Sequence, residues 1–143
     1  MKKVLITICL ILSITTNIWA IEAENIKVKV LSKTDVSWNK KALPEYPEGK
    51  PEITILKIII PPKVNLPWHT HPVINAGVLL KGQLTVVTEK NKILHLKAGD
   101  PIVEVINKWH YGKNEGKIPA EIIVFYAGIQ GKPITIKKDR GVK

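Results

Sequence analysis

The sequence is poor in cysteine, and this shortage excludes several kinds of site. Among its 143 residues there is one cysteine, Cys9, which lies in an N-terminal segment that we expect to be removed. Without it the mature chain can form no disulfide, no thiolate metal site and no cysteine nucleophile. An apolar core must therefore hold the fold together, and hydrophobic residues make up 45% of the chain.

Arginine is also scarce, although the chain is strongly basic. The formal net charge is +10, yet Arg140 is the only arginine among 22 basic residues. Specific recognition of nucleic acid favours the planar guanidinium group over the lysine ammonium. The lysines are scattered apart from a mild cluster over 132–143, which we interpret as a solvated basic end. We therefore expect no nucleic-acid partner.

The first twenty residues have the order of a secretory signal peptide. Lys2 and Lys3 precede an apolar run over 4–14, and the small residue Ala20 follows. The run is shorter than an ordinary membrane-spanning helix, and an uncleaved anchor is the alternative interpretation.

This order predicts a signal peptide over 1–20, with cleavage after Ala23 as the alternative to cleavage after Ala20. The remaining residues, 21–143, are then expected to form one domain in the periplasm or outside the cell, with no stable membrane span.

Beyond residue 20 the pattern is strand-like, and no window has helical periodicity. Apolar and polar residues alternate over 26–30, as in a half-buried strand, and later runs are rich in Ile, Val and Leu. Turn signals separate these runs at 81–82, 91–92, 98–100 and 107–108. We expect strands at 26–30, 52–60, 73–80, 84–88, 93–97, 102–106, 121–126 and 133–136. Some eight to ten short strands indicate an all-β barrel or sandwich.

Two of the four histidines, His69 and His71, lie in one tripeptide and could share a metal ion. On a strand, residues i and i+2 point to the same face, and the following proline favours extended geometry. Asn75 is the next polar side chain with the same parity. A metal centre needs further ligands, and the third imidazole must come from His95 or His110.

The histidine pair resembles the first motif of the cupin family, H-x-H-x(3,4)-E-x6-G. Here the pattern is His69-x-His71-x3-Asn75-x6-Gly82. Asn75 stands where the family has a glutamate ligand, so the expected site has one carboxylate fewer.

The second cupin motif, G-x5-P-x-G-x2-H-x3-N, resembles Gly99-x5-Val105-x-Asn107-x2-His110-x3-Asn114. Valine replaces the proline, and asparagine replaces the turn glycine. The second change is mild, because asparagine tolerates the left-handed backbone conformation.

The resemblance covers about residues 50–128 and implies a double-stranded β-helix, a small jelly-roll barrel. It implies that His69, His71 and His110 bind a divalent metal, which could be Fe, Zn, Cu, Ni or Mn. The neutral Asn75 favours Fe, Zn or Cu, and it would bind weakly, hold a water or orient a substrate. His95 matches no ligand position. The resemblance also implies a homodimer formed through edge strands, with 26–31 or 133–137 as candidates.

The residues around the site are predicted from strand parity. Trp68, Trp109 and Tyr111 neighbour the proposed ligands and should point away from the metal. Glu104 is expected to face solvent, as carboxylates usually do, with an interior acid as the alternative.

An apolar cavity in the barrel could be lined by Leu79, Val86 and Phe125. With few charged candidates inside, its ligand should be a small and mostly apolar molecule, or one that binds the metal through its own oxygens.

Two functions follow from these features. The first is a metal-dependent oxidoreductase similar to the quercetin-dioxygenase-like cupins, in which the metal acts as Lewis acid and template. The second is a non-catalytic periplasmic protein that binds a metal or a small ligand. Asn75 keeps the second function open, because it replaces the glutamate that could serve as a general base.

Overall fold

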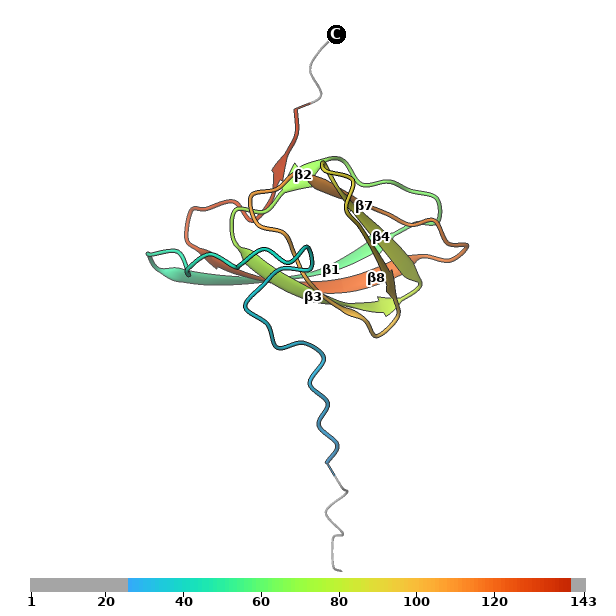
Figure 1. Ribbon diagram of the computed structural model, residues 1–143, viewed down its shortest axis with the longest axis horizontal. Helices are drawn as coiled ribbons and strands as arrows, with labels where there is room; N and C mark the ends of the chain where they lie inside the picture. Colours follow the sequence, from blue (N-terminus) through green and yellow to red (C-terminus); the bar gives the residue numbers. More distant parts are fainter. Residues whose placement is uncertain (1–25, 140–143) are drawn as a thin grey trace, which may run out of the picture.

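The computed structural model describes residues 26–139 and shows a barrel of two β-sheets, with strands in layers above and below a common interior (Figure 1). The expected signal peptide over 1–20 lies outside the described residues. Within them there is no helix, so none that could cross a membrane, and the prediction of an all-β fold is confirmed.

The first sheet contains four antiparallel strands in the order β1-β8-β3-β6. Their bounds are Pro51–Ile60 for β1, Ile74–Lys81 for β3, Pro101–Val103 for β6 and Ala120–Ile129 for β8. Strand β1 pairs along its whole length with β8, from Pro51 opposite Ile129 to Ile60 opposite Ala120. Strand β1 forms one edge of this sheet, and no segment within residues 26–139 pairs with its outer side.

The second sheet contains five strands in the order β5-β4-β7-β2-β9. Their bounds are His69–Thr70 for β2, Gln83–Thr88 for β4, Ile93–Lys97 for β5, His110–Lys113 for β7 and Ile136–Lys137 for β9. Strand β2 lies between β7 and β9, so a two-residue strand carries part of the candidate site.

Strands with a strong apolar pattern agree with the prediction, whereas three weaker ones differ. The expected strand at 102–106 ends at Val103, and the one at 133–136 is reduced to β9. The expected strand at 26–30 is wrong: Ile26 and Val28 are 90% and 87% exposed. These residues extend away from the barrel in Figure 1. Although apolar and polar residues alternate here, no strand among the described residues pairs with this segment.

The core lies between the two sheets and follows the two-residue period of the strands. On β1, Leu56 and Ile58 point inward and Ile60 is buried, whereas Ile53 and Ile55 are exposed on the outer face. Buried residues of β3, β4 and β8 complete the same cluster: Leu79, Leu84, Val86, Ile122, Val124 and Tyr126.

The turns between strands occur where the sequence predicts them. Gly82 and Gly99 have φ of 75° and 91°, in the region that favours glycine. Asn107, which replaces a motif glycine, has φ of 53°. Its backbone N–H donates to the carbonyl of His71 at 2.9 Å, so this turn fixes the chain beside the histidine pair.

Candidate metal centre

Three histidines that are far apart in the sequence meet inside the barrel. The pairing of β2 with β7 places His69 directly opposite His110, and His71 forms an isolated bridge with Ile106. The imidazole centroids lie 4.4 to 5.1 Å apart. One ring nitrogen from each lies within 4.8 Å of the other two. The structure therefore brings together the three residues that the motifs select.

Backbone carbonyls decide which ring nitrogen of each histidine is free. The Nδ1 atom of His69 lies 2.7 Å from the Pro67 carbonyl oxygen, and that of His110 lies 2.8 Å from the Lys108 oxygen. For His71 the partner is the Ile134 oxygen, at 2.8 Å. A carbonyl only accepts, so each Nδ1 carries the proton and each Nε2 keeps its lone pair. Three Nε2 atoms are thus prepared as ligands.

Burial keeps these imidazoles neutral. It lowers the pKa of His71 from 6.5 to about 3, although the hydrogen bond to Ile134 opposes the shift. Burial likewise lowers the pKa of His69 and of His110. Protons therefore do not compete for the Nε2 lone pairs at neutral pH.

The cluster also fits a metal because one of its atoms lacks any other partner. His110 is 1% exposed, and its Nε2 is buried without a hydrogen bond. Buried polar atoms in native proteins nearly always have a hydrogen-bond partner or a bound ion, so an ion at this Nε2 would satisfy it. Three neutral imidazole nitrogens suit a divalent transition metal and leave coordination positions open.

Comparison with known proteins settles the family. A family model described as a cupin domain matches residues 56–126. This chain is a cupin. A search of curated proteins finds no match.

Solved structures similar to this cupin share its fold at low sequence identity. An uncharacterised Klebsiella pneumoniae protein with a double-stranded β-helix domain is 19% identical, with a TM-score of 0.53 over 67% of this chain and 93% of that one. The lyase DddQ of Ruegeria pomeroyi, which acts on DMSP, is 16% identical, with a TM-score of 0.55 over 64% of this chain and 45% of its own. The predicted double-stranded β-helix is confirmed.

An oxalate oxidase in complex with the substrate analogue glycolate is 24% identical, with a TM-score of 0.51. The match covers 59% of this cupin and 45% of the oxidase, so the cupin spans less than half of that protein. Similarities of this size show the fold alone.

An apolar cavity of about 260 Å³ adjoins the three histidines of this cupin. Side chains from both sheets line it, among them Leu56, Ile58, Leu84, Val86, Ile122 and Val124. The predicted lining is therefore right for Val86. It is wrong for Phe125, which lies on the outer face of β8 and is 49% exposed, and Leu79 belongs to the core without reaching the cavity.

Asn75 points into the same cavity from β3. It is 1% exposed, and its Nδ2 donates a 3.3 Å bond to the Val73 carbonyl. Its Oδ1 atom is buried without a hydrogen-bond partner. The position that holds glutamate in the family motif thus still presents an unpaired oxygen near the histidines.

Glu104 corrects the sequence-based expectation that it faces solvent. Its side chain is 13% exposed, lines the cavity and places Oε2 3.7 Å from Nε2 of His110. Burial raises its pKa to about 7, partly offset by the N–H of Val105 and by nearby His69. Parity with the buried Ile102 was the available signal, but apolar residues occupy both faces of this run and obscured it.

Tyr126 was not singled out by the sequence, yet it lines the cavity. Its ring centroid lies 5.3 Å from that of His71. Burial and the neighbouring Glu104 raise its pKa to about 12, so the hydroxyl stays protonated and can donate a hydrogen bond. The sequence of this apolar strand does not indicate that its tyrosine side chain lies beside the histidines.

The aromatic residues beside the ligands contact one another or the basic tail. The rings of Trp68 and Tyr111 meet edge to face at 4.7 Å, and Lys138 Nζ lies 5.6 Å from the Trp109 ring centroid. None of the three aromatic residues lines the cavity. His95 is also away from it, with Nδ1 3.0 Å from the Thr85 hydroxyl.

The remaining motif residues position the chain. Asn114 is 1% exposed and joins β7 to neighbouring loops through side-chain hydrogen bonds. Gly82, Gly99 and Asn107 form turns, as their positive φ values show.

Proposed function

We propose that this cupin holds a divalent transition metal on His69, His71 and His110 and acts as a dioxygenase-like oxidoreductase on a small molecule. The observation that carries the proposal is the set of three Nε2 lone pairs. Backbone carbonyls orient them, and the three histidines line an apolar cavity. A bound ion would supply Lewis acidity and hold a substrate through its oxygen atoms.

The cavity suggests the size and character of the substrate. Its volume of about 260 Å³ and its aliphatic walls suit a small, mostly apolar molecule such as an enol, a diketone or a phenol. The protonated Tyr126 hydroxyl can donate a hydrogen bond to one of its oxygens. Lys137 also lines the cavity and offers a cation to an anionic substrate.

Metal binding is tested with histidine variants matched by a histidine outside the site. Wild-type protein and the variants His71→Ala, His110→Ala and His95→Ala are incubated with Fe, Zn, Cu, Ni or Mn, desalted and analysed for metal. We expect about one ion per chain in the wild type and in His95→Ala, and little or none in the other two. A wild type that retains no ion would contradict the proposal.

The catalytic part is tested by oxygen uptake. Metal-loaded protein is given flavonoid, diketone and thiol substrates, and chelator should abolish any consumption of oxygen. If the loaded protein consumes no oxygen with any of them, the dioxygenase assignment is wrong even though metal binding stands.

A second candidate function is binding without turnover, and Asn75 favours it. A neutral amide cannot serve as the general base that a glutamate would provide at this position. Asn75→Glu distinguishes the two functions. A large gain in oxygen uptake would identify the natural protein as a binding protein derived from an enzyme. Unchanged or reduced activity from an already active wild type would favour the enzyme.

A further inference from the structure

Within the described range 26–139, Glu104 is the only carboxylate that lines the cavity. It enters from the segment that follows β6, on the side of His110, whereas position 75 on β3 carries an amide. The site therefore does contain an acidic side chain, but it comes from the segment after β6 and not from β3, where the family motif indicates it.

This carboxylate is buried without a cationic partner. Among residues 26–139, no lysine forms an ion pair with it; the N–H of Val105 donates at 3.3 Å, and the buried indole of Trp38 also favours its charged form. Buried carboxylates are retained in proteins when they are paired or when they coordinate a metal. The contacts of Glu104 in the protein alone do not supply such a partner.

An ion in the proposed metal centre would lie close enough to pair with the Glu104 carboxylate. Oε2 of Glu104 lies 3.7 Å from Nε2 of His110, which has no hydrogen bond of its own. Two ligand atoms that each bind one ion at about 2.1 Å lie roughly 3 Å apart when they meet at a right angle. A movement of the Glu104 carboxylate by less than about 1 Å is therefore enough for both atoms to bind the same ion.

We propose that Glu104 is the carboxylate ligand of this metal centre, an inference that rests on the proposed function. The carboxylate missing from β3 is then replaced by one from the end of β6. A set of three neutral imidazoles and one carboxylate leaves the bound dication a net charge of +1. The added negative charge also makes the site better suited to harder ions such as Mn than three imidazoles and a neutral amide would be.

The test is metal affinity, which does not depend on turnover. Zn²⁺ affinity is measured by competition with a chromophoric chelator for wild type, Glu104→Gln and the control Glu52→Gln, which removes the same charge from an exposed position. We expect Glu104→Gln to bind at least about 10-fold more weakly and its Co²⁺ absorption spectrum to shift, with Glu52→Gln unchanged. Glu104→Gln with wild-type affinity and spectrum would overturn the proposal while the histidine site stands.

A measurement on the wild type covers the case in which the variant does not fold. The ¹³C signal of the Glu104 carboxyl should move when one equivalent of Zn²⁺ is added, and an unmoved signal from zinc-loaded protein would overturn the ligand role. If the wild type itself binds neither Zn²⁺ nor Co²⁺, the proposed function fails, and the role of Glu104 fails with it.

Discussion

The candidate ligands of this cupin are oriented by hydrogen bonds to backbone groups. The carbonyls of Pro67, Lys108 and Ile134 fix the three imidazoles, and no substitution at those positions removes a carbonyl. The orientation of the ligands is therefore secured by the path of the chain rather than by other side chains.

Asn114 also acts through the backbone, since its one buried amide pairs with three backbone groups, at the end of β1 and in the loop before β8. Its Nδ2 donates to the carbonyls of Ile60 and Ile118, at 2.9 and 2.8 Å, and its Oδ1 accepts the N–H of Gly116 at 2.9 Å. Asn114→Ala leaves these buried groups unpaired, so we expect the free energy of unfolding to fall by about 2–3 kcal/mol. Urea denaturation measures it, and a loss below about 0.5 kcal/mol would contradict this role.

At the residue scale, the sequence predicts the histidines better than it predicts Glu104. The spacing of His69, His71 and His110 depends on motifs that are local in the chain, and the barrel brings them together. Glu104 lies in a run where both faces are apolar, so alternation does not indicate which way its side chain points. Its burial depends on the segment that leaves β6, which only the folded chain determines.

At the scale of elements, strands with a strong local apolar pattern are predicted correctly from the sequence. Strands that form only because a distant strand pairs with them are not. Strands β1, β5 and β8 are dense in apolar residues and lie close to their predicted ranges. Strands β2 and β9 have two residues each and depend on pairing with distant segments, β2 with both β7 and β9 and β9 with β2. The segment 26–30 has a strand pattern but no pairing partner among the residues that the structure describes.

Two turn glycines provide a matched test of how tightly the elements pack. Both have positive φ, but a Cβ on Gly82 would lie 2.7 Å from the Pro119 carbonyl oxygen, whereas one on Gly99 would meet nothing within 4 Å. We expect Gly99→Ala to lower the unfolding free energy by about 1 kcal/mol, through backbone strain alone. Gly82→Ala should lose about 3 kcal/mol, because a clash with backbone adds to the strain. Equal losses in thermal or urea unfolding would show that Pro119 moves freely.

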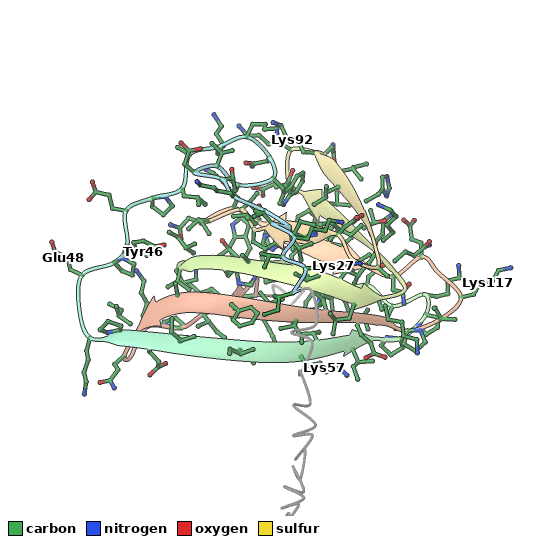
Figure 2. All side chains as sticks on the ribbon, turned by 90° about the horizontal axis from the view of Figure 1, so that it is seen from below. Lys27, Tyr46, Glu48, Lys57, Lys92 and Lys117 are labelled. Atoms are coloured by element: carbon green, nitrogen blue, oxygen red, sulfur yellow. The ribbon has the colours of Figure 1, made fainter. Side chains whose placement is uncertain are left out.

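At the scale of the whole molecule, the outer face of the first sheet is unusually apolar. Ile53, Ile55 and Phe125 are exposed there, and Ile55 lies directly opposite Phe125 in the β1–β8 register. Lys57 projects outward from the same strand in Figure 2, and its charge is balanced by Glu121 at 2.9 Å. An exposed apolar patch that includes an edge strand, one with no further partner within residues 26–139, suits association with a second copy.

We therefore expect a homodimer formed through this face rather than through 26–31, which is not a strand. Ile55→Lys should shift the protein from dimer to monomer in light scattering coupled to gel filtration, because it buries a charge in the interface. Ile93→Lys is the control, since Ile93 is 56% exposed on β5 of the other sheet. A wild type that remains monomeric at high concentration would contradict the expectation.

Because β1 pairs along its length with β8, the first sheet closes only after the chain has been synthesised past Ile129. Contacts between such distant segments form slowly, since a long loop must be ordered before they contribute. The strands that carry His69 and His110 lie inside that loop. An ion that needs all three imidazoles therefore meets them only in the finished barrel, and metal loading would follow folding instead of guiding it.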